Sequence, residues 1–244
     1  MPDPERRPAY YAAERGGWRD WWTLLHPPYT AWHLSYVAIG ACLAPRVDTS
    51  RLVATLLAFF LAVGVAAHAV DELHGRPLRT TISDGALVAV TAVSLTGAVV
   101  LGVIGVTRVG VVLVPFIVVG PLLVLAYNAE LFGGIVHSTV GFAAAWGAFP
   151  VLTGYVAQTS TLTLAAVLAG GAAFALSCAQ RVLSTPARLL RRSTRALDGT
   201  LTLADGTVLP LDERTLLAPL ETALRAISWG LVALASALAL ARLT

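Results

Sequence analysis

Long apolar stretches without a single charged residue are the feature that most constrains this chain. Residues 85–106 and 140–179 carry no charge, and a helix crosses the roughly 30 Å hydrocarbon core of a bilayer with about 20 apolar residues. Only 13% of the 244 residues are charged, against about 25% in an ordinary soluble domain. The sequence therefore excludes a soluble globular enzyme, a disordered chain and a disulfide scaffold, and it predicts an all-α polytopic membrane protein.

Seven stretches are apolar and long enough to be predicted as transmembrane helices, namely 29–44, 52–70, 85–106, 110–127, 140–157, 162–179 and 226–240. Arginines set their orientation, because cytoplasmic loops are enriched in positive charge. With the N-terminus inside, four arginines lie outside and thirteen lie inside, namely Arg6, Arg7, Arg15, Arg19, Arg76, Arg79, Arg181, Arg188, Arg191, Arg192, Arg195, Arg214 and Arg225. We therefore expect an integral protein of the cell (inner) membrane, with its N-terminus and its candidate active-site loops in the cytoplasm.

Two predicted parts of the chain lie outside the membrane core. Residues 1–28 carry Tyr10, Tyr11, Trp18, Trp21 and Trp22 among charged residues, which predicts an interfacial segment at headgroup depth. Residues 181–225 are predicted to form a small Arg-rich cytoplasmic insert. In it, the run TLTLADGTVLPL favours a β-hairpin and Asp212 fits the N-cap of an amphipathic helix. The expected division is 1–28, a six-span core at 29–180, the insert at 181–225 and a final transmembrane helix at 226–244.

The scarce charges gather first at the end of the second predicted helix, in His68-Ala69-Val70-Asp71-Glu72-Leu73-His74. Residues three and four apart share a helix face, so these imidazoles and carboxylates form a candidate metal site. The oxygen ligands favour Mg²⁺, and the imidazoles also allow a transition metal. Arg76 and Arg79 follow at once, and their guanidinium groups suit phosphate oxygens. The alternative is an interfacial loop whose acids pair with its own arginines.

Two more polar patches are predicted on the same membrane face. The first contains Tyr127, Asn128, Glu130 and His137, and Glu130 is the only charge between Arg108 and Arg181. An ionisable residue near the membrane interior is a functional candidate, although Glu130 is also explained as a residue that caps a helix or snorkels. The second patch runs from Arg181 through Arg188 to Arg195. It suits an anionic headgroup, or else it is a topology signal that lies on anionic lipid. His26 and His33 are interpreted as hydrogen-bonded structural residues.

Three of these features together resemble the UbiA superfamily of intramembrane prenyltransferases. The segment Arg76-Pro77-Leu78-Arg79 is similar to the stretch that follows the first Asp-rich motif of that family. Tyr127-Asn128, followed by Trp146-Gly147-Ala148-Phe149-Pro150 and Gly154-Tyr155, is similar to the family's segment around its fifth helix. The polar loops after the second, fourth and sixth helices share one face, as in that fold. The resemblance covers about residues 22–192.

The resemblance implies a helical bundle that acts on an isoprenyl diphosphate, by prenyl transfer to a lipophilic acceptor or by terpene cyclisation, with Mg²⁺-assisted loss of diphosphate. By position, the resemblance places Asp71 and Glu72 in the first Asp-rich motif with His68 at its start, and it implies that Arg76 and Arg79 face phosphate. Together with the residue patterns above, the candidate catalytic residues are Asp71, Glu72 and Glu130, and the candidate metal ligands are His68, Asp71, Glu72 and His74. The candidate substrate-binding residues are Arg76, Arg79, Tyr127, Asn128, His137, Arg181 and Arg188. The sequence departs from the family in two ways: it has seven predicted helices instead of nine, and residues 180–192, where the second Asp-rich motif falls, contain no carboxylate.

Three classes of function are compatible with these patterns. The first is the UbiA-like prenyltransferase or cyclase. The second is a transition-metal enzyme on the same scaffold, with iron, zinc or manganese in a His/carboxylate site made from His68, Asp71, Glu72, His74, Glu130 and His137. The third is a non-catalytic membrane or lipid-binding subunit, which the missing motif and helices favour. The expected partners are an isoprenyl diphosphate, a lipophilic acceptor and membrane lipids, with a second copy or a partner subunit completing the bundle. Membrane topology explains the arginine clusters, so nucleic acid is not an expected partner.

Overall fold

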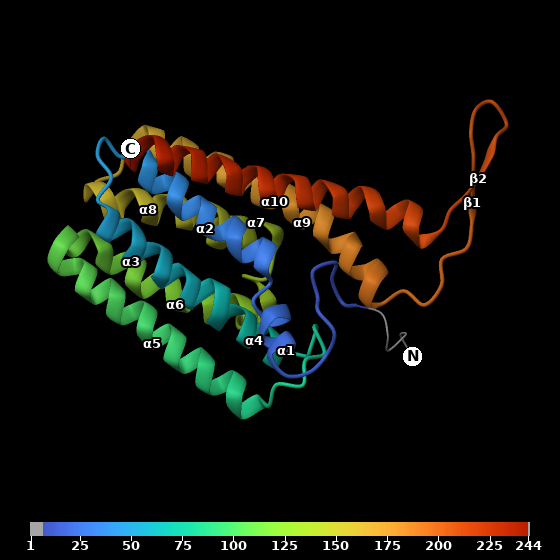
Figure 1. The fold of residues 1–244 in the computed structure, drawn as a ribbon, viewed down its shortest axis with the longest axis horizontal. Coiled ribbons are helices and arrows are strands. Elements are labelled where there is room, and N and C mark those ends of the chain that lie inside the picture. Colours follow the sequence, from blue (N-terminus) through green and yellow to red (C-terminus); the bar gives the residue numbers. More distant parts are fainter. Residues whose placement is uncertain (1–6, 244) are drawn as a thin grey trace.

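A computed structural model describes residues 7–243 as a bundle of long helices with one short β-hairpin (Figure 1). Within the described residues, six helices are long and apolar enough to cross a membrane, as predicted for a polytopic membrane protein. They span Thr49–Leu73, Asp84–Val109, Val111–Asn128, Thr139–Thr159, Leu164–Arg192 and Glu213–Leu243. Arg6, which entered the orientation count, lies outside the described residues.

The predicted first span is present as a helix but is shorter than the other six. Helix α2 covers Pro27–Cys42, which is 16 residues, or about 24 Å at the α-helical rise of 1.5 Å per residue. It packs between α8 (Phe149–Thr159) and α10 (Glu213–Leu243), and Trp32, Tyr36 and Val37 are at most 1% exposed. The structure thus supports six membrane-length helices and a buried seventh helix, and the predicted count of seven spans is not confirmed.

Two glycines allow α2 and α8 to pack closely. A Cβ atom on Gly154 would overlap the carbonyl oxygen of Val37, and one on Gly40 would overlap the carbonyl oxygen of Val151. Small residues at helix contacts let backbones approach in membrane proteins, where van der Waals packing replaces the hydrophobic effect between helices. This contact anchors α2 in the centre of the bundle.

Two of the membrane helices contain a π-helical stretch, which is a rare conformation that is common at functional sites. In the first, α3 (Thr49–Phe59) continues through η1 (Phe60–Ala67) into α4 (His68–Leu73). In the second, α7 (Thr139–Ala143) continues through η4 (Ala144–Ala148) into α8. Both π-helical segments contribute to the hydrophobic core, with Val63 from η1 and Trp146 from η4 in the same buried cluster.

The boundaries of the predicted insert at 181–225 differ from those observed. Helix α9 runs from Leu164 to Arg192, so the arginines from 181 to 192 form the last turns of a membrane helix. Helix α10 is continuous from Glu213 to Leu243, so no break separates an amphipathic helix from a final span at 226. The pairing of Arg191 with both carboxylate oxygens of Glu221 joins these two helix ends.

Between α9 and α10, the predicted β-hairpin is confirmed. Strand β1 (Thr200–Thr202) pairs antiparallel with β2 (Val208–Pro210), and Gly206 has a φ of 88° in the turn. The predicted N-cap of α10 is also present, because Asp212 Oδ1 accepts hydrogen bonds from the Thr215 amide at 2.7 Å and the Thr215 hydroxyl at 2.6 Å. The hairpin extends away from the bundle in Figure 1.

The remaining helices complete the bundle and its polar end. Helix α5 covers Asp84–Val109, and the short η2 (Val111–Leu113) leads into α6 (Val114–Asn128), with η3 (Phe132–Gly134) in the loop that follows. Helix α1 (Trp18–Leu24) lies near α4 at the end of the bundle where α9 also ends (Figure 1). Trp18, Trp21 and Trp22 are exposed there, as the prediction of an interfacial segment requires.

Candidate functional site

The polar end of the bundle contains a cavity of about 350 Å³, called the polar cavity below. It lies among the N-terminal segment, α2, the helix that ends in α4, the 127–142 region, the last turns of α9 and the first turns of α10. All five histidines of the chain line it. The predicted site residues that it brings together are His68, Asp71, His74, Tyr127, Asn128, Glu130, His137, Arg181 and Arg188.

One wall of the polar cavity consists of arginines from α9. Arg181, Arg188 and Arg192 lie seven and four residues apart on this helix and all line the cavity. Arg181 donates hydrogen bonds to the Tyr127 hydroxyl and the His137 carbonyl, and Arg192 donates one to the Pro8 carbonyl at 3.2 Å. Among the described residues, none of these three arginines forms an ion pair with a carboxylate. Three uncompensated guanidinium groups around one cavity make it suited to an anion.

The adjacent carboxylates Asp71 and Glu72 face different surroundings. Glu72 is fully buried and accepts hydrogen bonds from the Leu78 amide at 2.9 Å, the Thr80 amide at 2.8 Å and the Thr80 hydroxyl at 2.9 Å. It therefore shapes the loop after α4, and the prediction that it binds metal or substrate does not fit this geometry. Asp71 lines the polar cavity, and no hydrogen bond or ion pair within the described residues holds its carboxylate.

The two arginines that were predicted to bind phosphate belong to the loop beside the cavity. Arg76 pairs with Asp84 and also donates a hydrogen bond to the Ile82 carbonyl at 2.6 Å. Arg79 donates to the Arg192 carbonyl at 3.5 Å. Neither residue lines the polar cavity. For Arg76, the alternative of a loop whose acids and arginines pair with each other describes the structure better than the prediction.

The residues after α6 form a rim around the cavity. The ring of His137 stacks on Tyr127 with centroids 4.5 Å apart, and its Nδ1 lies 3.1 Å from the Tyr127 carbonyl. Glu130 lies between two histidines, 3.9 Å from His74 Nε2 and 3.7 Å from His137 Nδ1. Asn128 donates to the Val124 carbonyl at 2.8 Å while lining the cavity.

Backbone carbonyls fix the orientation of three of the histidines. The Nδ1 atoms of His33, His68 and His137 lie 2.9, 3.0 and 3.1 Å from the carbonyls of Trp146, Gly64 and Tyr127, respectively. A carbonyl oxygen only accepts hydrogen bonds, so each Nδ1 carries the hydrogen and each neutral ring keeps a free electron pair on Nε2. The polar cavity thus combines a wall of cationic donors with imidazoles that act as acceptors.

Three residues that line the cavity have a buried polar atom without a hydrogen-bond partner among the described residues, namely Tyr10 Oη, His26 Nε2 and Gln180 Oε1. His26 is 8% exposed and Gln180 is 3% exposed. Buried polar groups are nearly always satisfied, so such atoms beside a cavity favour a bound polar ligand. The ring of His26 also stacks on His68, with centroids 4.2 Å apart and an angle of 18° between the rings.

His26, His33 and Arg192 are cavity residues that were not among the predicted site residues. A signal for the two histidines was present, because the predicted topology places both near the start of a helix that begins on the same face as His68. Arg191 lines the cavity as well, but it pairs there with Glu221. Nothing in the local sequence predicts that Arg191 has an ion-pair partner and that Arg192 has none within the described part of the chain.

The N-terminal segment covers part of the polar cavity, which differs from its prediction as a purely interfacial segment. Tyr11 lies against His26, with its hydroxyl 2.5 Å from Nδ1, and burial raises the pKa of Tyr11 well above 10.0. Tyr10 packs its ring under the Arg225 guanidinium at 4.6 Å. Asp20 fixes the segment, because its carboxylate accepts from the Gly16 amide at 3.0 Å, the Thr81 amide at 2.7 Å and the Thr81 hydroxyl at 2.5 Å.

The side chains do not form the predicted metal site by themselves. Among the described residues, no three His, Cys, Asp or Glu side chains come together as a metal-binding group. Of the predicted ligands, Glu72 is held by the loop backbone and His68 is stacked on His26. The predicted ligands therefore do not gather into one group among the described residues, and the Mg²⁺ site and the transition-metal site stay predictions.

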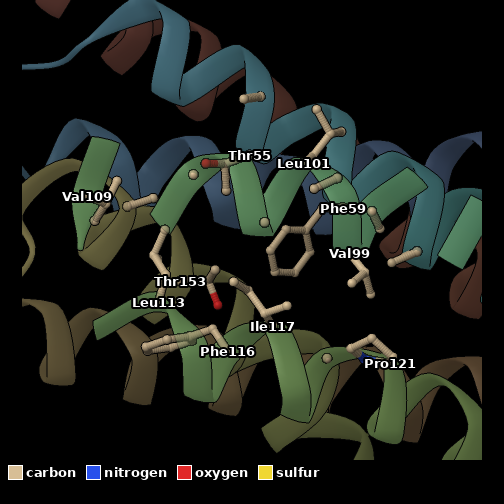
Figure 2. Close-up of a pocket in the computed structure, with 18 of the residues that line it drawn as sticks. Thr55, Phe59, Val99, Leu101, Val109, Leu113, Phe116, Ile117, Pro121 and Thr153 are labelled. Carbon is tan, nitrogen blue, oxygen red and sulfur yellow. The ribbon is translucent and has the colours of Figure 1, made fainter. Parts of the chain in front are cut away.

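A second cavity, called the apolar groove below, has a volume of about 480 Å³ and lies between α3, α5, α6 and α8. Figure 2 shows Phe59 of α3 and Ile117 of α6 pointing toward one another in it, with Phe116 nearby. Val63 and Trp146 line both the apolar groove and the polar cavity. One residue from each π-helical segment is thus common to the two linings, and this pair is called the junction below.

Comparison of the chain with protein-family models, with curated proteins and with solved structures finds no match.

Proposed function

We propose that this protein binds an isoprenyl diphosphate and acts on it within the membrane, by prenyl transfer to a lipophilic acceptor or by cyclisation of the chain. The observation that carries the proposal is that the polar cavity and the apolar groove are neighbours that share Val63 and Trp146 in their linings. The three arginines of the polar cavity suit an anionic head, and the apolar groove suits a hydrocarbon tail. Together they are complementary to an anionic amphiphile. The resemblance to the UbiA superfamily supports the same substrate class.

The arginine wall supplies the chemistry that loss of diphosphate needs. Breaking the bond between C1 and oxygen leaves negative charge on the diphosphate, and fixed guanidinium groups stabilise charge that develops in a water-poor site. Arg181, Arg188 and Arg192 are placed for this, and bidentate contacts to phosphate oxygens are typical of arginine. Asp71 is the carboxylate retained as a candidate catalytic residue, because it lines the same cavity.

The junction is the place where the reacting carbon would lie. With the head among the arginines and the tail in the apolar groove, C1 lies near Trp146 and Val63. The face of an aromatic ring attracts a cation, so Trp146 is suited to stabilise the positive charge that develops on the allylic carbon. The larger count of arginines on this membrane face supports a cytoplasmic location for the site.

The direct test uses protein reconstituted in nanodiscs with a bacterial total-lipid extract, which supplies acceptors. Allylic diphosphates of ten to twenty carbons are added, and the release of diphosphate is measured. We expect release with at least one donor and its loss in Asp71→Asn. No release across the whole set of donors contradicts the proposed reaction.

Tight binding without turnover would instead support the third function, a membrane protein that holds an anionic lipid. Residues 180–192, where the resemblance places a second acidic motif, contain no carboxylate. This absence favours a binding protein over an enzyme. Binding of farnesyl thiodiphosphate, which does not lose its leaving group readily, measures occupancy apart from reaction. The two measurements together separate an enzyme from a binding protein.

A further inference from the structure

One helix face connects the junction with the arginine wall. Val63, Ala67, His68, Asp71 and His74 all line the polar cavity, and they follow one another along the helix that runs through η1 into α4. His68 therefore stands between Val63, which also lines the apolar groove, and Asp71. In the proposed substrate pose, this is the level of the bond between C1 and the diphosphate.

The hydrogen bond to Gly64 prepares His68 to accept a proton. Its Nδ1 donates to the Gly64 carbonyl, 3.0 Å away and four residues earlier in the π-helical segment. The free electron pair is thus on Nε2, and the tautomer is fixed by a backbone group that cannot itself change its protonation. His68 is also partly exposed, whereas His33 is only 5% exposed beside the junction.

The neighbour stacked on His68 is His26. Burial first, then the proximity of His68 and Arg192, lowers the pKa of His26 well below 6.5. His26 therefore stays neutral near pH 7. Its Nδ1 lies 2.5 Å from the Tyr11 hydroxyl, and its ring covers one face of His68, which holds the His68 ring in place.

We propose that His68 Nε2 accepts the proton that the reaction releases. This role rests on the proposed function. As the bond from C1 to oxygen breaks, both electrons leave with the diphosphate, and C1 forms a new bond with electrons from the acceptor or from a double bond of the chain. The acceptor, or the carbon next to the resulting cation, then loses a proton to Nε2. The electrons of the bond to that proton stay on the acceptor as a lone pair, or form a new double bond in the chain. His68 becomes an imidazolium near the departing diphosphate.

The test compares wild type, His68→Ala and His68→Phe in nanodiscs. His68→Phe keeps an aromatic ring against His26 but has no nitrogen that accepts a proton. General-base catalysis contributes about 10²–10⁴-fold, so we expect both variants to lose turnover by about that factor and to bind farnesyl thiodiphosphate within about threefold of wild type. Added imidazole should restore part of the turnover of His68→Ala and none of that of His68→Phe, whose ring fills the space.

Each outcome separates the role of His68 from the proposed function. Turnover in the wild type that is unchanged in His68→Ala contradicts the proton-accepting role alone. Loss of binding in both variants also contradicts it, because His68 would then hold the substrate or the fold. Lack of turnover in the wild type contradicts the proposed function, and it therefore also contradicts the role of His68.

Discussion

At the scale of single residues, the neighbouring acids Asp71 and Glu72 show how a one-residue step on a helix separates two tasks. Glu72 has both oxygens engaged by the backbone and side chain of the loop after α4. Asp71 faces the polar cavity without such partners among the described residues. Replacing each carboxylate by the corresponding amide should therefore affect protein stability differently at the two positions.

We expect Glu72→Gln to destabilise the protein and Asp71→Asn to leave its stability nearly unchanged. An amide cannot accept all three hydrogen bonds of Glu72, and a buried unsatisfied donor costs about 1–3 kcal/mol. The measurement is the midpoint of thermal aggregation in detergent for both variants. Equal midpoints would contradict the structural role of Glu72.

Arginine contacts give a second prediction at this scale. Arg188→Ala should weaken the binding of farnesyl thiodiphosphate by about 10–100-fold, because a hydrogen bond to a charged group contributes about 1.5–3 kcal/mol. Arg195→Ala is the matched control, since Arg195 lies just beyond the end of α9 and does not line the cavity. Isothermal titration in detergent measures both, and equal losses would indicate nonspecific attraction by positive charge.

The same titration tests the need for a metal ion. Since the described side chains form no metal-binding group and arginines supply the positive charge, we expect binding of farnesyl thiodiphosphate to change less than about threefold when EDTA is added. Loss of binding in EDTA that Mg²⁺ restores would show that the diphosphate is held through a cation, as the resemblance implies.

At the scale of elements, the N-terminal segment is held by one carboxylate. Burial raises the pKa of Asp20, but hydrogen bonds from Thr81 and Gly16 outweigh it and lower the pKa below 3.8. The contribution of Asp20 is therefore complete above pH 3.8 and is lost as the pH falls through the lowered value. Asp20→Asn should free the segment already at pH 7, and faster hydrogen exchange in residues 8–17 than in wild type would show it. Unchanged exchange would contradict this anchoring.

The contact between α2 and α8 gives a prediction with an internal control. Gly154→Ala should destabilise the bundle by about 1–3 kcal/mol, because the added Cβ overlaps the Val37 carbonyl and forces backbones apart. Gly230→Ala adds the same atom in α10 with no heavy atom within 4 Å, and alanine is the better helix former by about 1 kcal/mol. The thermal midpoint should fall for the first variant and not for the second.

The elements also show what the sequence could predict. The long apolar stretches predicted the six membrane-length helices, and Asp205-Gly206 predicted the hairpin because local turn chemistry determines it. The ends of α9 and α10 could not be predicted, because Arg181–Arg192 is polar enough to be a loop and is helical through its contacts with α10. In the site, residue spacing correctly predicted that His68 and Asp71 share one helix face. The burial of the Glu72 carboxylate in the following loop could not be predicted, because it depends on hydrogen bonds from Leu78 and Thr80.

At the scale of the whole molecule, two cavities of different character lie side by side in one bundle and share Val63 and Trp146. The polar cavity gathers every histidine of the chain and three arginines without ion-pair partners among the described residues. The apolar groove of about 480 Å³ lies beyond Val63 and Trp146 among the membrane helices. An amphiphile that uses both should bind more tightly than either its head or its tail alone.

The most direct test of this claim is photo-crosslinking with an allylic diphosphate that carries a diazirine on its terminal isoprene unit. We expect crosslinks to residues of the apolar groove, such as Phe116 and Ile117, and we expect unlabelled farnesyl diphosphate or the Arg188→Ala substitution to suppress them. The claim would be contradicted by crosslinks to exposed side chains of α5, such as Val93 and Val103, whose yield changes neither with unlabelled farnesyl diphosphate nor in Arg188→Ala.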